Sequence, residues 1–299
     1  MNQEERLDYL INAFGQEVQG KLRLSETGDT YEKRRLLRSL MNIRMPGRMS
    51  KEVLSVQDSY LKERIRENGV VRWNELPSVK EQGSTLIHGD RISLWQGDIT
   101  TIEADAIVNA ANAQMLGCFV PMHACIDNCI HTFAGIQLRL ECAEQMKKLR
   151  MQFGEDYEQP TAVPMLTEGY NLPAHHVIHI VGPIVSGSLT RKDETDLENC
   201  YRRTLDLCKA NDLRSVVFCC ISTGVFCFPN NRAAEIAVKT VTAWMDEYPE
   251  AMDRIIFNVF KDQDKKLYEK ELLLKAVEQK ESTACSIRGQ IILPKRQTG

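Results

Sequence analysis

The stretch Ser215-Val-Val-Phe-Cys-Cys-Ile-Ser-Thr-Gly-Val-Phe-Cys-Phe-Pro-Asn-Asn231 decides the fold class, because it passes from an apolar run through a short loop into a helix. Residues 215–221 are almost entirely apolar, which is typical of a strand buried on both faces. Residues 231–247 then follow with helical spacing. A buried strand followed by a helix is the repeating unit of a largely parallel sheet covered by helices on both faces.

The same alternation extends in both directions along the chain. We predict strands at 92–96, 106–109, 176–181 and 254–260, and helices at 127–149, 193–211 and 262–279. In such α/β folds, ligands bind at the carboxyl ends of the strands, where loops lead into helices. The loops after Asn109 and after Ile221 are therefore the places where a site is expected.

Residues 1–75 have a different sequence pattern from the rest of the chain. Apolar residues recur at helical spacing around residues 7–14, 31–41 and 50–68, and no long strand pattern interrupts them. We therefore predict a helical N-terminal extension over residues 1–75, an α/β domain over 76–275 and a loose tail over 276–299.

Composition narrows the classes of function. The 299 residues are 43% hydrophobic and 26% charged, with a net charge of −3. That balance gives no basic field to attract nucleic acid, and we expect no nucleic-acid partner. No apolar run approaches the roughly 18 residues of a membrane span, and the charged first residues do not resemble a signal peptide. The 10 cysteines are therefore expected to be reduced thiols in the cytoplasm.

The loop after Ile221 contains small residues followed by a helix start. Ser222, Thr223 and Gly224 would let the backbone approach a ligand closely, and amides near a helix start form an anion site. One interpretation is a phosphate or pyrophosphate cradle. The alternative is an ordinary turn that needs Gly224 for its geometry.

Two carboxamides follow the strand at 106–109. Asn109 and Asn112 could bond the vicinal hydroxyls of a ribose, or they could cap and form turns as Asn commonly does. Asp98 also has two interpretations. It could be a turn residue, or it could accept a hydrogen bond from an exocyclic amine.

A cysteine–histidine cluster follows directly. Cys118, His123 and Cys125 lie within eight residues, in a segment that contains a proline. Thiols and imidazole are the ligands that zinc selects. Three protein ligands leave a fourth position open, as in catalytic zinc sites. Chance is the alternative, because a chain with 10 cysteines can place two near a histidine.

Asp127 stands at the predicted start of the next helix. Its ordinary role there would be an N-cap, worth about 1 kcal/mol. Two residues from a candidate zinc ligand, it could also orient a water or bind a sugar hydroxyl.

Six ordered motifs in this chain resemble the macrodomain family. They are Gly97-Asp-Ile-Thr, Val108-Asn-Ala-Ala-Asn, Asp127-x-x-Ile-His, Gly169-Tyr-Asn-Leu-Pro, His176-Val-Ile-His-Ile-Val-Gly-Pro and Ile221-Ser-Thr-Gly-Val-Phe-x-Phe-Pro. The resemblance covers about residues 75–275 and is to the branch that removes ADP-ribose from proteins. It implies a three-layer α/β/α sandwich around a mixed sheet.

The resemblance also implies roles for matched positions. Asp98 would bond the adenine amine, with Ile99 beside it, and Phe260 would pack on the adenine. Asn112 would contact the distal ribose, and Asp127 falls where the family's hydrolases carry their catalytic acidic residue. The remaining substrate-binding positions implied are Ile126, Asn128, Ser222, Thr223, Gly224, Val225 and Phe226.

The loop over residues 117–126 departs from the glycine run of the usual hydrolases and is similar to the zinc-containing macrodomains of microbes. That branch has a helical N-terminal extension, and some members are encoded beside a sirtuin that ADP-ribosylates a lipoyl-carrier protein. The resemblance implies a zinc-dependent hydrolase acting on carboxylate-linked ADP-ribose, with Asn112 and Asp127 as catalytic residues and Zn²⁺ on Cys118, His123 and Cys125. The alternative is a reader that binds ADP-ribose without turnover and carries a structural zinc.

Overall fold

The computed structural model describes residues 1–18 and 28–273. Its helices are α1 (Gln3–Glu17), α2 (Thr30–Ile43), α3 (Lys51–Asn68), α4 (Ile126–Ala134), α5 (Ile136–Phe153), α6 (Arg191–Ala210), α7 (Asn230–Glu247) and α8 (Asp262–Leu273), with 3-10 turns η1 (Trp73–Glu75) and η2 (Ile99–Thr101). Its strands are β1 (Val71–Arg72), β2 (Ile92–Gln96), β3 (Ile102–Glu103), β4 (Ala106–Ala111), β5 (Met165–Glu168), β6 (His176–Val181), β7 (Ser215–Phe218) and β8 (Arg254–Val259).

The centre of the molecule is a six-stranded mixed sheet in the order β2-β8-β7-β4-β6-β5. All neighbouring pairs are parallel except β5 with β6, which is antiparallel. The apolar runs of β4, β7 and β8 are almost wholly buried, as expected for strands covered on both faces.

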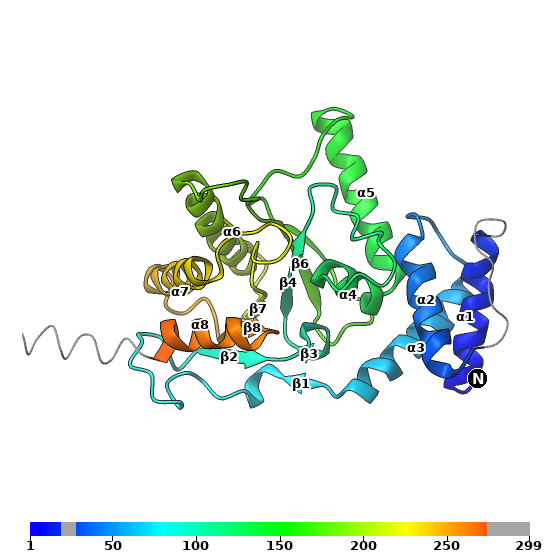
Figure 1. The fold of residues 1–299 in the computed structure, drawn as a ribbon, viewed down its shortest axis with the longest axis horizontal. Helices are drawn as coiled ribbons and strands as arrows, with labels where there is room; N and C mark the ends of the chain where they lie inside the picture. The colour runs from blue at the N-terminus through cyan, green and yellow to red at the C-terminus, as the bar shows by residue number, and fades with distance from the viewer. Residues whose placement is uncertain (19–27, 274–299) are drawn as a thin grey trace, which may run out of the picture.

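Helices cover both faces of the sheet (Figure 1). The crossovers from β6 to β7 and from β7 to β8 step in one direction along the sheet, and the crossover from β4 to β6 steps in the other. Because such crossovers are right-handed, α6 and α7 lie on one face and α4 and α5 on the other. Helix α8 packs beside α7. The result is the three-layer α/β/α sandwich that the sequence predicted.

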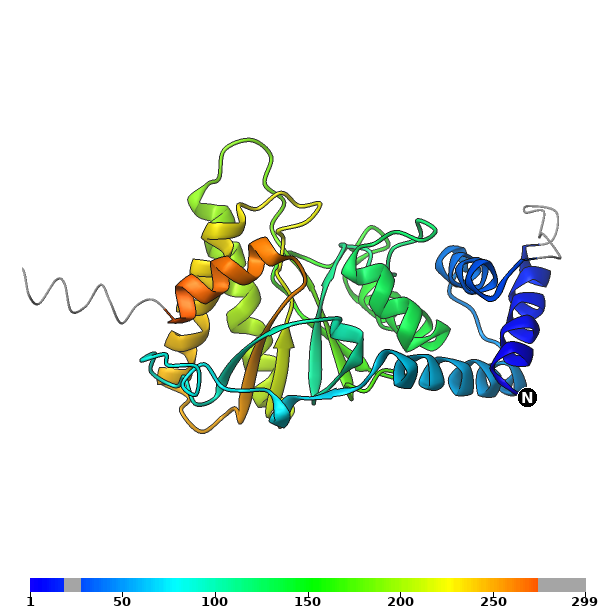
Figure 2. The same ribbon diagram turned by 60° about the horizontal axis from the view of Figure 1, so that its bottom comes forward.

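Helices α1–α3 form a separate N-terminal module at one end of the molecule (Figure 2). They have their own apolar core, which includes Leu10, Phe14 and Leu40. Asn2 and Glu5 form a capping box at the start of α1, and Ser50 caps α3. Ile136, the first residue of α5, packs into the same core and so joins the module to the sandwich.

One prediction about the elements is wrong. The single helix expected over 127–149 is two helices, because Gly135 adopts φ 99° between them. The edge strand β5 was not predicted. The helix expected over 262–279 is present as α8 up to Leu273, and its last residues lie outside the described part of the chain, as does the predicted tail.

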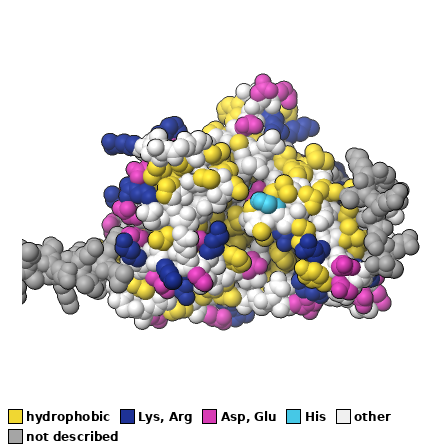
Figure 3. All heavy atoms as spheres, viewed as in Figure 1, with side chains coloured by type: hydrophobic (Ala, Val, Ile, Leu, Met, Phe, Trp, Pro, Cys, Tyr) yellow, Lys and Arg dark blue, Asp and Glu magenta, His cyan; other side chains and the backbone are white. Residues whose placement is uncertain are grey.

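The surface carries charges of both signs. On the face seen in Figure 3, basic and acidic side chains are intermixed. No helix among the described residues is both long and apolar enough to cross a membrane.

Candidate active site

Parallel strands end at one edge of the sheet and bring distant loops together. β2, β4, β6, β7 and β8 all run in the same direction, so their carboxyl ends share that edge. Asp98 follows β2, Asn112 follows β4 and Ser222 follows β7. Because β4 and β7 are neighbours, the loops after Asn109 and Ile221 begin side by side at this edge.

The loop after β7 forms a turn bordered by open space. Ser222 (φ 64°) and Cys227 (φ 56°) adopt the left-handed conformation, whereas Gly224 does not. The interpretation that the turn needs Gly224 for its geometry is therefore wrong. The amide of Phe228 donates to the Ser222 carbonyl over 3.0 Å and closes the loop. A Cβ on Gly224 would meet no atom within 4 Å, so a ligand could approach the backbone closely there.

The loop after β6 supports this turn from one side. A Cβ on Gly182 would lie 2.0 Å from Ser222 Oγ, so a glycine is required at this position. The Val185 amide donates to the Phe226 carbonyl over 2.9 Å. Ser222 Oγ is buried and has no hydrogen-bond partner among the described residues, and a ligand oxygen would satisfy it. Thr223 is half-buried and Val225 is exposed.

The predicted adenine-binding residues lie beside β2 and β8. Asp98 Oδ1 accepts from both the amide and the hydroxyl of Thr100, at 2.9 and 2.7 Å, so the carboxylate caps η2. Ile99 is buried beneath it. Phe260 follows β8 and is 76% exposed, and its carbonyl accepts from Gln96. An exposed aromatic ring at the end of β8, the strand paired with β2, is a suitable surface for a nucleobase.

Asp127 is the second residue of α4 and is only 5% exposed. It does not cap the helix, because the N-cap is Cys125, whose sulfur accepts from the Asn128 amide. Asn109 Nδ2 donates to Asp127 Oδ1 over 2.8 Å, and Asn112 Nδ2 lies 3.4 Å from Oδ2. Burial raises the pKa of Asp127 to about 6, even though the Asn109 bond lowers it. A carboxyl group with that pKa can exchange a proton near neutral pH.

A buried hydrogen-bond network on strands β4, β5 and β6 holds the Asp127 carboxyl group. Asn109 and His179 are opposite each other in the β4–β6 register, and Asn109 Nδ2 lies 3.0 Å from His179 Nδ1. His179 Nε2 lies 3.0 Å from Thr167 Oγ1. Burial lowers the pKa of His179 to about 3, so its ring is neutral. Asn109 is fully buried and its Nδ2 is engaged with Asp127 and His179, so contact of Asn109 with a sugar hydroxyl stays a prediction.

His131 lies on the other side of Asp127. Its Nε2 is 3.5 Å from Asp127 Oδ1, and burial holds the pKa of His131 well below its usual range. The ring packs under Gly117, where a Cβ would come within 2.7 Å of it. Gly117 adopts φ 77°, so both the backbone conformation and the close approach require glycine. His131 therefore supports the start of the loop that carries the cysteine cluster.

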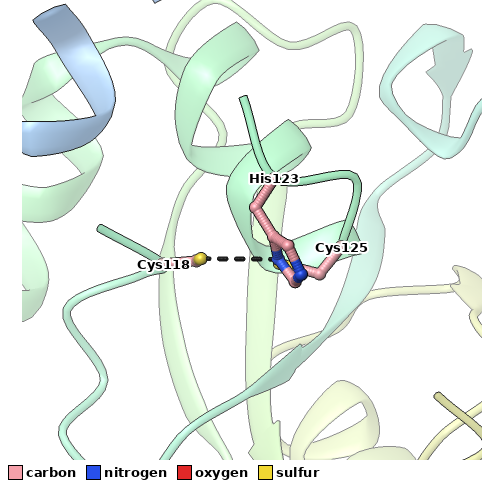
Figure 4. Close-up of side chains that lie close together, drawn as sticks. All are labelled: Cys118, His123 and Cys125. Carbon is pink, nitrogen blue, oxygen red and sulfur yellow. Dashed lines mark hydrogen bonds between the residues drawn. The ribbon is translucent and has the colours of Figure 1, made fainter. Parts of the chain in front are cut away.

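The predicted metal ligands converge (Figure 4). Cys118, His123 and Cys125 each offer an atom within 4.8 Å of the others, and Cys118 Sγ lies 3.6 Å from His123 Nδ1. Burial, together with the neighbouring Cys118, raises the pKa of the Cys125 thiol to about 12. Two thiols and an imidazole at this spacing match the donor set of a zinc site with one open position.

A second Cys–His group lies in the interior. His131, Cys142 and His179 also have ligand atoms within 4.8 Å of one another. However, both ring nitrogens of His179 already have hydrogen-bonding neighbours. We therefore assign this group to the support of Asp127.

Asn128 and Ile126 flank Asp127 in the sequence but differ in how deeply they are buried. Asn128 is fully buried, and its Nδ2 donates to the carbonyls of Val120 and Cys118, at 3.0 and 3.4 Å. Ile126 is half-buried. The structure thus brings Asp127, Asn112 and the cysteine cluster together, while the carboxamide of Asn128 is engaged with the loop. Contact of Ile126 and Asn128 with a ligand stays a prediction.

Sequence reasoning missed His131 and His179 as supports for Asp127. The available signal was a histidine inside the buried run of β6, since a polar side chain in such a strand needs an internal partner.

Comparison with known proteins shows that this chain is similar to macrodomains and to protein-ADP-ribose hydrolases. A family model described as Macro domain matches residues 108–237. A protein-ADP-ribose hydrolase of Treponema medium is 48% identical over 90% of this chain and 99% of its own length. One of Staphylococcus aureus is 42% identical over 88% of this chain and 93% of its own length. The crystal structure of a Trypanosoma brucei macrodomain in complex with ADP-ribose superposes with a TM-score of 0.59, at 29% identity over 82% of this chain and 96% of that one.

Proposed function

The chain belongs to the macrodomain family, and from that premise we propose that it hydrolyses ADP-ribose from mono-ADP-ribosylated proteins. One observation carries the proposal: the buried carboxyl group of Asp127 accepts from the carboxamide of Asn112, on a helix whose N-cap, Cys125, belongs to the convergent cysteine cluster. The relatives from Treponema medium and Staphylococcus aureus, whose names describe this activity, match nearly their whole length.

We place the substrate along the strand edge. The adenine would lie between Asp98 and Phe260, and the diphosphate against the turn formed by Ser222 to Phe226. The buried, unpartnered hydroxyl of Ser222 supports this placement. The distal ribose would then reach Asn112 and Asp127, whose carboxyl group bonds Asn109 underneath. Holding the diphosphate fixes the position of the anomeric carbon.

The proposed reaction is hydrolysis of a carboxylate ester of ADP-ribose. A bond forms between a water oxygen and the anomeric carbon, and the bond from that carbon to the linking oxygen breaks. The water proton passes to a base, and the target recovers its carboxylate. Asp127 would accept that proton or a hydrogen bond from a ribose hydroxyl, because its carboxyl group lies beside Asn112, which would hold the same ribose.

We propose that zinc is held by Cys118, His123 and Cys125. The donor set and the convergence of the three ligand atoms fit this ion. A zinc ion there supplies Lewis-acid chemistry at an open coordination position. The chain itself contributes the orientation: His131 and Gly117 fix the start of the loop, and Cys125 begins the helix that carries Asp127.

The substitution Asp127→Ala separates a hydrolase from a reader. We expect turnover of an ADP-ribosylated protein to fall at least about 100-fold, within the range typical of general acid–base groups. ADP-ribose should still bind, because the adenine and diphosphate contacts are elsewhere. A wild-type protein that binds ADP-ribose tightly but releases none from a modified target would be the reader instead.

The substitution Cys125→Ser tests the metal. We expect loss of bound zinc, measured by elemental analysis, together with loss of turnover. A variant without zinc that keeps full turnover would exclude a catalytic metal. If the metal is only structural, adding a chelator should lower the stability and the activity of the protein together.

We also propose a target class and a location. The target would be a protein modified on aspartate or glutamate, such as a lipoyl-carrier protein modified by a linked sirtuin. The resemblance of the loop over residues 117–126 to the zinc-containing branch supports this. The nine cysteines of the described residues are free, which supports the cytoplasm. Turnover on glutamate-linked, arginine-linked and lipoyl-carrier substrates, compared side by side, tests the target class.

A further inference from the structure

The loop from Gly117 to Cys125, which we call the metal loop, has no helix or strand of its own. Inside it, the His123 amide donates to the Val120 carbonyl over 3.2 Å. Ligands that converge on one point from such a loop need support from outside it. That support comes largely from the N-terminal module.

Asn42, near the end of α2, holds the loop next to His123. Its Oδ1 accepts from the Met122 amide over 3.0 Å, and its Nδ2 donates to Thr132 Oγ1 over 3.0 Å. Asn42 is only 1% exposed. Met122 adopts φ 59°, a conformation that residues other than glycine rarely keep without restraint. The Asn42 bond supplies such a restraint and ties the loop to α4.

Arg38, one turn earlier on α2, holds the other side of His123. Its Nη2 donates to the His123 carbonyl over 2.9 Å and to Asn128 Oδ1 over 2.8 Å. The Nδ2 of Asn128 in turn donates to the Val120 carbonyl, so the guanidinium acts on two points of the metal loop. The backbone on both sides of His123 is thus bonded to the same face of α2.

Arg139 on α5 completes the link. Its Nη1 donates to the carbonyls of Asn42 and Arg44, at 2.8 and 2.6 Å. Its Nη2 lies 3.5 Å from the Cys118 carbonyl, and its guanidinium sits 4.3 Å from the centre of the Phe119 ring. The end of α2 and the first ligand of the cluster therefore share one buried arginine.

We propose that α2 is part of the metal site, and that Arg38 and Asn42 are positioning residues that keep Cys118, His123 and Cys125 convergent beside Asp127. The inference rests on the proposed zinc site. It assigns the N-terminal module to the construction of that site, through hydrogen bonds between residues 80 to 90 positions apart. Residues that orient ligands in this way typically change metal affinity about 10- to 100-fold when they are removed.

The test compares Arg38→Met with Arg35→Met in the full-length protein. Arg35 lies on the same helix, is exposed and approaches Tyr31 instead of the loop. Zinc affinity is measured by competition with a chromogenic chelator. We expect Arg38→Met to bind zinc at least about tenfold more weakly, Arg38→Lys to fall between, and Arg35→Met to match wild type. Excess free zinc should restore the turnover of Arg38→Met, which a general packing defect would not allow.

Affinity for ADP, which lacks the distal ribose, reports on the rest of the fold and should not change. Asn42→Ser provides a second variant with the same expected loss of zinc. Wild-type zinc affinity in both Arg38→Met and Asn42→Ser would overturn the inference. A wild-type protein that takes up no zinc would overturn the proposed metal itself, and this role of α2 with it.

Discussion

Asn109 Nδ2 donates to Asp127 Oδ1 over 2.8 Å and joins the centre of strand β4 to the first turn of helix α4. The same nitrogen lies 3.0 Å from His179 Nδ1 on the neighbouring strand. The sheet thereby holds the carboxyl group that the proposed reaction uses. Asn109 is fully buried, and its effect on the reaction is expected to pass through Asp127.

Asn109→Ala should lower both stability and turnover. The change leaves the buried Asp127 carboxyl without its closest donor, and an unsatisfied buried group of this kind costs about 1–3 kcal/mol. Chemical unfolding and steady-state kinetics measure the two effects. Gln114→Ala, at an exposed position just beyond the same strand, is the control. Equal unfolding free energies for Asn109→Ala and wild type would refute the role assigned to the bond.

His179→Gln should make the protein less sensitive to acid. The folded-state pKa of His179 is lowered from 6.5 to about 3, so the unfolded chain binds more protons between these values. Its contribution to stability is present above pH 6.5 and is lost as the pH falls toward 3. Between pH 6.5 and 4.5, the wild type should lose about 2 kcal/mol more unfolding free energy than the variant. The exposed His175, changed to Gln, is the control, and a pH-independent difference between wild type and His179→Gln would contradict the assignment.

Gly182→Ala should weaken ADP-ribose binding. The new Cβ would lie 2.0 Å from Ser222 Oγ and must displace the turn that is proposed to hold the diphosphate. Overpacking of this kind costs about 1–3 kcal/mol, so an affinity about 5- to 150-fold lower is expected by calorimetry. Gly47→Ala, whose Cβ would come no closer than 3.8 Å to another atom, should bind normally. Unchanged affinity in Gly182→Ala would mean that the ligand does not use this turn.

Removing the metal should abolish turnover without changing nucleotide binding. A chelator is expected to abolish release of ADP-ribose and leave the affinity for ADP unchanged, because the Ser222 turn follows β7 and the metal loop follows β4. Added zinc should restore turnover. Parallel loss of ADP binding on chelation would indicate a metal that holds the whole domain together.

The sequence predicted what depends on local pattern. The apolar runs of β4, β7 and β8 identify the sheet, and the positions of Asn112 and Ser222 after their strands follow from its parallel order. The break between α4 and α5 was missed, because a single glycine within a helical pattern does not reveal that its φ is 99°. The short edge strand β5 was missed because four residues carry little periodicity.

Long-range polar contacts could not be predicted in the same way. Arg38 lies on a helix with an ordinary amphipathic pattern, and only the docking of α2 against α4 brings it to His123 and Asn128. Likewise, Asn109 has the residue type expected for a sugar contact, but the pleat of β4 turns it toward His179. Which face a polar residue points to is set by packing that no local motif encodes.

The most direct test of the account is a time course of ADP-ribose release from a glutamate-modified protein by the purified, zinc-loaded chain. We expect release over many turnovers by the wild type and at least about 100-fold slower release by Asp127→Ala. Both proteins should still bind ADP-ribose. Release by Asp127→Ala at the wild-type rate, or none by the zinc-loaded wild type, would contradict the account.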